Sequence, residues 1–347
     1  MRRVLAVVGA AAMVAGSLAL RSRLDRRSAE RSQVLRLTCA SELEAACARL
    51  ATGDSRVKVT VEPAGVTADR LATTTTVDSG LDGWLAPAAW PDLVDQERQS
   101  HALPALFAGP RPTVARSPLV LAVWKDRAAA LAPRCGPGGL GWTCLGEAAG
   151  TPGGWQAVAG HPEWGDVKPG HTSPASTAVG LLVVGQAVAA WFGRAAVSTA
   201  DLEDDGFQRW FGGLERAVPA PAASPLQTML VTGPATFDAA ATTEAEAAPL
   251  LATSARRDSV DLLYPAPMAT ADVVLATGPG GGAASSLRDV AAGRPGRAAL
   301  AAAGWRVDGE PLAAGVPDRP ALPTAAGLPP AGLLDALRSQ WHGVTGR

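Results

Sequence analysis

Short segments typical of strands and helices alternate through the first ninety residues of the chain. Residues 34–38 (VLRLT), 57–61 (VKVTV) and 81–85 (LDGWL) have the length and the apolar character of strands. Helix-like segments that begin at Ser41 and Thr67 separate them. Because a repeated strand–helix order builds a parallel sheet with helices on its faces, we predict an α/β fold.

The alternation continues less regularly in the rest of the chain. A Pro-rich stretch at residues 104–118 precedes the fully apolar segment 119–124 (LVLAVW), which we predict to be a strand. The remaining strands are expected at residues 229–232, 260–264 and 273–276. Helices are expected after the loop at 168–177 and at residues 205–214, 242–252, 286–304 and 333–341.

Composition and missing motifs disfavour several classes of function. The chain has 347 residues, of which 47% are hydrophobic, enough for two domains or one two-lobed unit. A formal net charge of −1 argues against a general nucleic-acid-binding protein. No GxSxG, HExxH, P-loop or Rossmann glycine motif is present, and the 4 histidines are expected on solvated loops. We therefore expect no enzyme, no cofactor and no metal site.

The N-terminus has the features of an export signal. Arg2 and Arg3 precede an apolar run over residues 4–20. This run would span about 26 Å as a helix, which is short for a membrane span but long for a signal peptide. Ser17 and Ala19 could mark a cleavage site, and an uncleaved signal anchor is the alternative. Arginines after the run favour a cytoplasmic flank, but the cysteines and the resemblance described below favour export.

The four cysteines indicate disulfides if the chain is exported. Cys135 and Cys144 bracket a glycine-rich loop that closes easily. Cys39 and Cys47 are harder to join, because a strand end and the following helix can hold them too far apart. Three connectivities are possible, and a zinc site is disfavoured because CxxC spacing is absent.

Residues 168–193 (KPGHTSPASTAVGLLVVGQAVAAWFG) combine a polar loop with a long apolar helix. Hydroxyl residues crowd the predicted helix start, among them Thr172, Ser176 and Thr177. A helix N-terminus carries unpaired N–H groups and a positive dipole end, which suit an anion or a polar ligand. Ordinary N-capping by serine or threonine is the simpler interpretation of these residues alone.

Several polar or aromatic residues lie where predicted strands meet loops or helices. They are Ser41, Trp84, Ser117, Thr172 and Tyr264. Each has a structural explanation of its own, as a cap, a core residue, a turn residue or a strand end. In an open α/β sheet, however, ligands bind at the carboxyl ends of the strands, so together these residues suggest one cleft.

Between residues 34 and 310 the chain resembles bacterial extracellular solute-binding proteins with the type II periplasmic fold. The resemblance lies in the order and spacing of LRLTCASELEAACARLA, GLDGWLAPAAW, RSPLVLAVWKD, HTSPASTAVGLL, DLLYPAP and LAAAGWRV. It is greatest for the actinobacterial branch whose binding module often precedes a von Willebrand factor type A domain, and molybdate-binding proteins are more distant relatives. The DxSxS motif of that adhesion domain is absent here. Cys39-Ala40-Ser41 also replaces the small-Ser-Pro start common in the family.

The resemblance implies two α/β lobes, each a mostly parallel sheet flanked by helices, with hinge crossings near residues 115–118 and 264–267. Residues 1–33 would form the signal segment and linker, 34–115 and 266–347 lobe one, and 116–265 lobe two. The lobes would close on a ligand between them. The residues that would hold this ligand are Ser41, Trp84, Ser117, Thr172, Ser176 and Tyr264.

The function implied is that of an exported or membrane-anchored binding protein of an ABC transporter. Its ligand would be small and polar or anionic, although no Arg or Lys falls on a strand-end position. Its partners would be this ligand and a membrane permease or envelope protein, and we expect a monomer at the cell envelope or outside the cell. The alternative is a binding fold that has lost its ligand and serves as an envelope or adhesion scaffold.

Overall fold

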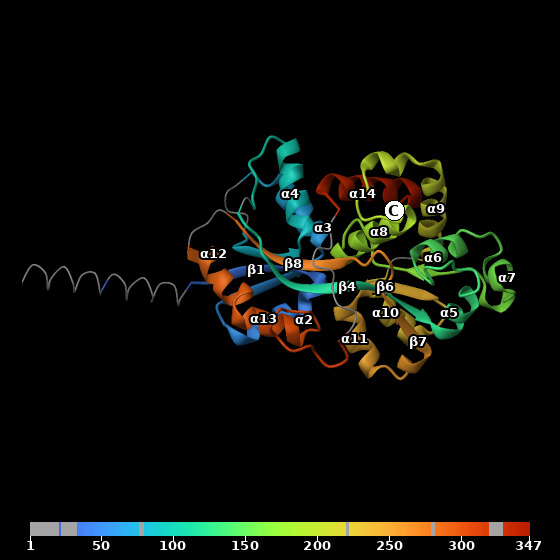
Figure 1. The fold of residues 1–347 in the computed structure, drawn as a ribbon. Coiled ribbons are helices and arrows are strands. Elements are labelled where there is room, and N and C mark those ends of the chain that lie inside the picture. The colour runs from blue at the N-terminus through green and yellow to red at the C-terminus, as the bar shows by residue number, and fades with distance from the viewer. Residues whose placement is uncertain are drawn as a thin grey trace, which may run out of the picture.

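A mixed eight-stranded sheet runs through the centre of the molecule, with strand order β2-β1-β3-β8-β4-β6-β5 and β7 paired with β4 (Figure 1). The computed structural model describes Arg21 and residues 33–75, 80–107, 109–219, 222–278, 282–318 and 329–347. The predicted signal segment at residues 4–20 lies outside these residues. Every helix inside them is too short or too polar to cross a lipid bilayer.

Strands β1, β2 and β3 form the parallel part of the sheet, which confirms the expectation from their alternation with helices. The β1 strand lies between the other two, and five of its six residues are buried, since both of its faces carry helices. The strands occupy Leu35–Ala40 (β1), Val57–Glu62 (β2), Gly83–Pro87 (β3), Thr113–Trp124 (β4), Pro169–Gly170 (β5), Ala239–Thr243 (β6), Val260–Leu263 (β7) and Thr270–Thr277 (β8).

The long strand β4 joins the two halves of the sheet. Its residues 113–118 pair with β8 in the first half, which contains β2, β1, β3 and β8. Its residues 119–124 pair with β6 and β7 in the second half, which also contains β5. The chain leaves along β4 and returns between β7 and β8, so the outgoing and returning strands are antiparallel. The predicted parallel arrangement therefore holds for β1–β3 but not for the pairs of β4.

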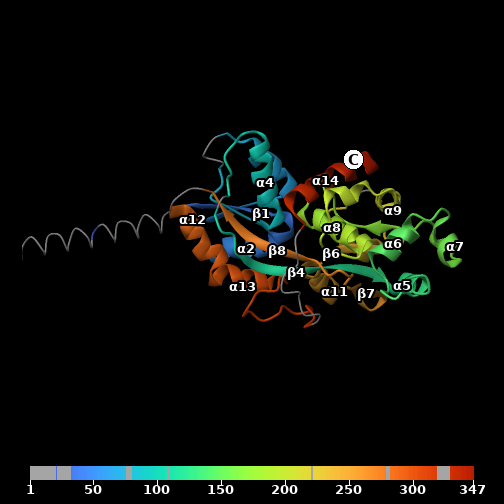
Figure 2. The same cartoon turned by 45° about the horizontal axis from the view of Figure 1, so that its top comes forward.

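Helices cover both faces of the sheet (Figures 1 and 2). In the first half, α2 and α13 pack together below the sheet, and α3 and α4 pack together above it. The α-helices are Glu44–Gly53 (α2), Ala64–Thr73 (α3), Ala89–Ser100 (α4), Lys125–Leu131 (α5), Trp142–Ala149 (α6), Gly154–Ala159 (α7), Ala178–Phe192 (α8), Asp205–Ala217 (α9), Pro225–Thr232 (α10), Glu244–Thr253 (α11), Gly282–Leu287 (α12), Arg294–Ala302 (α13) and Ala331–Thr345 (α14). Short 3-10 or π turns occupy Ser41–Leu43 (η1), Pro162–Trp164 (η2), Thr199–Glu203 (η3), Arg257–Ser259 (η4) and Arg288–Ala292 (η5).

Helix α8 is the central helix of the second half. All of its residues from 178 to 188 are buried, as expected for a helix that is apolar on every side. Thr177 caps its start and Gly193, in the left-handed conformation, ends it. The predicted helix after the polar loop is thus confirmed, and its start is fixed at Thr177.

The C-terminal helix α14 lies across both halves of the sheet. It packs on α4 of the first half and on α8 and α9 of the second (Figure 1). Its buried residues are Leu333, Leu334, Leu337 and Trp341, and the Trp341 indole donates a hydrogen bond to Glu215 on α9 at 2.9 Å. The prediction placed residues 266–347 in lobe one, whereas this helix touches both halves. The predicted crossings lie on β4 and on the β7–β8 connection, and the lobe bounds stay a prediction.

One secondary-structure prediction in the second half is wrong, and strands β5 and β6 were not predicted. Residues 229–232 were expected to be a strand but end helix α10, because the Ser224 side chain caps that helix and Pro225 occupies its first turn. Strand β6 was not predicted, because its sequence AAATT lacks the large β-branched and aromatic residues typical of strands.

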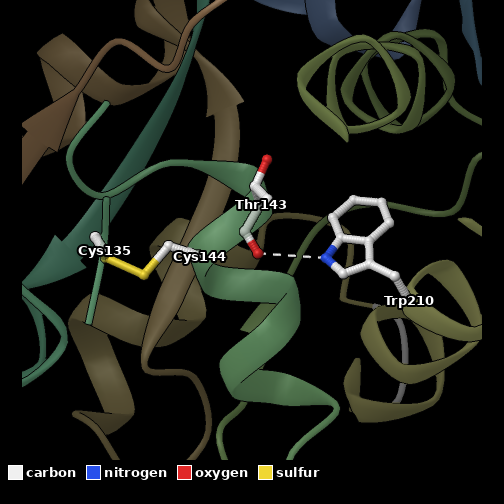
Figure 3. The surroundings of a disulfide bond; sticks show 4 residues. All are labelled: Cys135, Thr143, Cys144 and Trp210. Atoms are coloured by element: carbon white, nitrogen blue, oxygen red, sulfur yellow. Dashed lines mark hydrogen bonds between the residues drawn. A yellow bond between two sulfur atoms is a disulfide. The ribbon is translucent and has the colours of Figure 1, made fainter. Parts of the chain in front are cut away.

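The four cysteines form two disulfides, Cys39–Cys47 and Cys135–Cys144. In the first, the 3-10 turn Ser41–Leu43 brings the start of α2 back to the end of β1, which leaves the Cα atoms 6.7 Å apart. The expected difficulty of joining Cys39 to Cys47 is therefore overcome. The second closes the glycine-rich loop onto α6, next to the bond from the Trp210 indole to the Thr143 carbonyl at 3.3 Å (Figure 3).

Candidate functional site

A cavity of about 720 Å³ lies between the two halves of the molecule. On the first-half side it is lined by residues 41–49 of η1 and α2 and by residues 302–305 after α13. On the other side it is lined by the loop before α8, the start of α10 and helix α11. A space enclosed by elements from both ends of the long strand β4 is the kind of site that hinge closure shapes around a ligand.

The predicted helix start forms part of the cavity wall. Thr172 and Thr177 both line the cavity, and their hydroxyl groups are hydrogen-bonded to each other at 2.7 Å. The Thr177 hydroxyl also accepts a hydrogen bond from the Gly180 N–H at 3.1 Å, so it caps α8. The simpler N-capping interpretation is therefore correct for Thr177, and the capped end lies at the cavity.

Glu42 accepts a backbone hydrogen bond at the start of α8. Sequence reasoning did not identify Glu42 as a residue of the site. Its Oε1 accepts a hydrogen bond from the Val179 N–H at 3.0 Å, which links the first half to the second. Its Oε2 is buried and has no hydrogen-bond partner. Burial raises the pKa of Glu42, and the nearby charge of Glu246 raises it further, although backbone hydrogen bonds oppose the shift. The α8 N-terminus is thus already occupied by a carboxyl group that belongs to the chain.

Glu246 is held in place on the opposite wall. The hydroxyls of Ser224 and Thr242 donate hydrogen bonds to its two carboxylate oxygens. The backbone N–H of Glu246 donates a hydrogen bond to the hydroxyl of Thr243, the N-cap residue of α11, at 3.3 Å. Sequence reasoning assigned this segment to a helix but attached no site residue to it, because its hydroxyl partners come from outside that helix.

Charged and aromatic side chains complete the cavity wall. Among the described residues that line the cavity, Glu42, Glu44 and Glu246 are acidic and Arg49 is basic. Trp305 follows α13 and is the aromatic residue among the described lining residues, with 2% of its surface exposed. Carboxylates therefore outnumber guanidinium groups around the cavity.

Three of the six predicted site residues lie at or beside the cavity. Ser41 and Thr172 line it. Ser176 lies beside it and makes a contact between the halves, since its carbonyl accepts a hydrogen bond from the Gly65 N–H at 2.8 Å. A Cβ atom at Gly65 would lie 2.5 Å from the Ala175 carbonyl oxygen, so only glycine permits this approach.

The other three residues do not line the cavity and have structural roles. Trp84 is fully buried in the core and lies 6.0 Å from the Phe107 ring, measured between ring centres. The buried Ser117 hydroxyl accepts a hydrogen bond from the Ala245 N–H at 2.9 Å, which supports the start of α11. Tyr264 donates a hydrogen bond to Glu244 at 2.5 Å. Their role in ligand binding stays a prediction, because none of them lines this cavity.

Glu244 joins the two halves beside the β4 strand. This fully buried carboxylate accepts hydrogen bonds from Arg306 Nε at 2.7 Å and Nη2 at 2.9 Å. The hydrogen bond to Glu244 raises the pKa of Arg306. Burial, followed by the hydrogen bond and charge of Glu244, raises the pKa of Tyr264. Glu244, Arg306 and Tyr264 therefore form one hydrogen-bonded cluster, here called the Glu244 hub, at the crossing between the halves.

His171 is buried next to Thr172, contrary to the expectation that it lies on a solvated loop. It bonds the Thr172 carbonyl through Nδ1 at 2.8 Å and Glu215 Oε2 through Nε2 at 3.1 Å. Burial alone would lower the pKa of His171, but the Glu215 charge and the hydrogen bonds raise it. The pair therefore anchors the loop to α9, which itself holds α14.

The described residues place no three His, Cys, Asp or Glu side chains close enough to hold a metal ion. The cavity instead is lined by separate carboxyl groups, hydroxyls and small apolar side chains. Such a surface can bind and orient a small molecule by hydrogen bonds and charge.

Comparison with known proteins supports a binding fold. The sequence model of the family described as bacterial extracellular solute-binding protein matches residues 35–306. No curated protein matches the chain significantly. Among solved structures, a periplasmic thiamin binding protein is similar with a TM-score of 0.60 and 12% identity, over 90% of this chain and 96% of that one.

Two further structures have similar folds. The periplasmic binding protein AfuA from Actinobacillus pleuropneumoniae, with fructose-6-phosphate bound, has a TM-score of 0.61 and 11% identity, over 90% of this chain and 99% of that one. Iron-bound HitA from Pseudomonas aeruginosa has a TM-score of 0.57 and 15% identity, with the same coverage. At these identities the likeness concerns the fold, and it confirms the predicted two-lobed α/β architecture.

Proposed function

Because the chain belongs to the family of bacterial extracellular solute-binding proteins, we propose that it binds its solute in the cavity between the two halves of the sheet. The observation that carries the proposal is the composition of this cavity. Its wall combines residues from both halves, and the halves are joined by the continuous strand β4 and the β7–β8 connection. A ligand that contacts both walls would stabilise the closed arrangement.

The proposed solute is small and polar. Ser41, Thr172, Ser224 and Thr243 line the cavity together with acidic residues, while alanines, Val179 and Pro249 contribute its apolar parts. The three proteins compared above bind thiamin, fructose-6-phosphate and iron according to their descriptions, so the fold itself accepts chemically different ligands. The side chains of this chain must therefore select its solute.

We further propose that the protein acts as a monomer outside the cytoplasm and delivers its solute to a membrane permease. The family assignment supports export, and the two disulfides suit an oxidising compartment. The apolar run at residues 4–20 would direct export and would either be cleaved or remain as an anchor.

The site proposal is tested by blocking the cavity. Ala48 is an exposed residue of α2 that lines the cavity, and Ala48→Trp would fill part of it. Ala157 is an exposed helical alanine outside the cavity lining, so Ala157→Trp is the matched control. Native mass spectrometry of the secreted full chain should show a bound small molecule on the parent protein and on Ala157→Trp, but not on Ala48→Trp.

Two results would contradict this proposal. If Ala48→Trp retains the same bound mass as the parent protein, the solute binds elsewhere. If no variant carries or accepts a small molecule, the chain is better described by the alternative of a binding fold that serves as a scaffold.

A further inference from the structure

We propose that helix α14 acts as a strap that keeps the two halves closed without solute, and that Arg338 makes its main contact with the first half. The inference rests on the proposed function, because a protein that encloses its solute between two halves must part them to admit it. It concerns a different surface from the cavity, since α14 packs on α4 in the first half and on α8 and α9 in the second.

Helix α14 is fixed to the second half. Its Trp341 is 4% exposed, and the indole donates a hydrogen bond to the buried Glu215 of α9 at 2.9 Å. Arg347, which follows the helix, donates to the carbonyls of Val218 and Pro219 at 3.3 and 3.2 Å. We therefore expect α14 to move together with the second half when the molecule opens.

The contact of α14 with the first half is less completely packed. A cavity of about 340 Å³ lies between α14 and helices α3 and α4. From α14 it is lined by Asp335, Arg338, Ser339 and His342. An interface that encloses such a gap gives up fewer van der Waals contacts when it separates than a filled interface does. The surface between α14 and the first half is therefore the one that can part.

Arg338 connects α14 to the first half across this surface. Its Nη2 lies 3.6 Å from Asp69 Oδ1 on α3, and its guanidinium lies 5.4 Å from the centre of the Trp90 ring on α4. The same Nη2 donates a hydrogen bond to the Ala175 carbonyl, in the loop before α8, at 3.2 Å. One side chain of α14 thus contacts both halves, and these contacts must break when the halves part.

Two backbone hydrogen bonds between the halves report whether the molecule is closed. The Gly65 N–H donates to the Ser176 carbonyl at 2.8 Å, and the Val179 N–H donates to Glu42 at 3.0 Å. Both N–H groups lie in the first turn of a helix, α3 or α8, where the helix itself offers no acceptor. Their protection from hydrogen exchange therefore measures contact between the halves and not the stability of either helix.

The experiment measures the secreted full chain without solute, by hydrogen exchange resolved to single amides and by small-angle X-ray scattering. Because Arg338→Ala removes a charged hydrogen-bond donor and an ion pair, it should speed exchange of the Gly65 and Val179 amides at least about tenfold. The radius of gyration should increase at the same time. The amide of Gly185, in the middle of α8, should keep its parent rate and so show that the variant is folded.

A second variant and matched controls separate opening from local loosening. Asp69→Ala removes only the partner on α3; since the Asp69 side chain is 71% exposed, its loss does not threaten folding, and exchange should rise about threefold. Arg257 and Asp258 form an exposed ion pair within the second half, also at 3.6 Å. Arg257→Ala and Asp258→Ala should therefore leave both exchange rates and the radius of gyration unchanged.

The strap is overturned if folded Arg338→Ala keeps the radius of gyration of the parent, even where exchange near Ala175 rises. It is also overturned if the Gly65 amide of the solute-free parent exchanges as fast as an unprotected amide. If Arg338→Ala fails to fold, Asp69→Ala decides by the same measurements. Because no solute is used, a negative result leaves the proposed function standing, whereas failure of that function would appear as the absence of bound mass in native mass spectrometry.

Discussion

The Glu42 carboxylate and the Val179 N–H are hydrogen-bonded at 3.0 Å across the space between the two halves of the molecule. The two residues are 137 positions apart in sequence. The bond joins two residues of the cavity wall and places a carboxyl group at the start of α8.

We predict that Glu42 makes folding less favourable as the pH rises. Its raised pKa means that the folded state binds a proton more tightly than the unfolded state does. The free energy of unfolding therefore falls as the pH rises from the ordinary to the raised value. Glu42→Gln should remove this slope, which urea unfolding at a series of pH values would measure. An identical slope in both proteins would contradict the prediction.

We predict that Gly65→Ala forces the halves apart. The new Cβ would lie 2.5 Å from the Ala175 carbonyl oxygen and 2.8 Å from Ser176 Cα, so the backbone must shift. The expected loss in the free energy of unfolding is about 2 kcal/mol. Gly53→Ala is the matched control, because nothing lies within 4 Å of its Cβ position, and it should change stability by less than about 0.5 kcal/mol. Equal effects of both variants in chemical unfolding would refute the steric explanation.

We predict that Tyr264 and Glu244 contribute unequally to the free energy of unfolding. Tyr264→Phe removes one hydrogen bond and should cost about 1 kcal/mol. Glu244→Ala removes the partner of Arg306 from a buried site and should cost about 3 kcal/mol. Because both side chains bond the same carboxylate, the double variant should lose less than the sum of the two. Additive losses in chemical unfolding would show that Tyr264 and Glu244 act independently.

We predict that the His171–Glu215 pair contributes stability at low pH. The raised pKa of His171 means that its contribution is fully present below the ordinary histidine pKa and is lost as the pH rises through the raised value. His171→Ala should cost about 3 kcal/mol at acidic pH. His161→Ala is the control, since His161 is partly exposed with Glu163, and it should cost less than about 1 kcal/mol. A loss for His171→Ala that stays constant with pH would exclude the charged pair.

The fold and part of the site follow from local sequence patterns. Strand–helix alternation predicted the parallel strands, and the hydroxyl-rich loop predicted the start of α8 and its Thr172. Trp84 and Ser117 could not be assigned in this way, because neighbouring side chains in a strand alternate between faces and the sequence does not say which face a ligand approaches. Their burial in the core follows from strand pairings that are distant in sequence.

The acidic residues of the cavity show a different limit of sequence reasoning. Glu42 looks like an ordinary acidic residue in the first turn of a helix, where such residues are common. Its function as a cap for α8 depends on closure of the two halves. Glu246 likewise gains its position from Ser224, which precedes another helix. Properties of this kind arise from tertiary structure alone.

The disulfide between Cys39 and Cys47 makes part of the cavity wall depend on the redox conditions around the protein. It closes the short segment that carries Ser41 and Glu42, two residues of the cavity wall. Thiols remain reduced in the cytosol, so a newly made chain there lacks this covalent closure. In an exported chain, this segment of the cavity wall would therefore acquire its covalent closure only outside the cytosol.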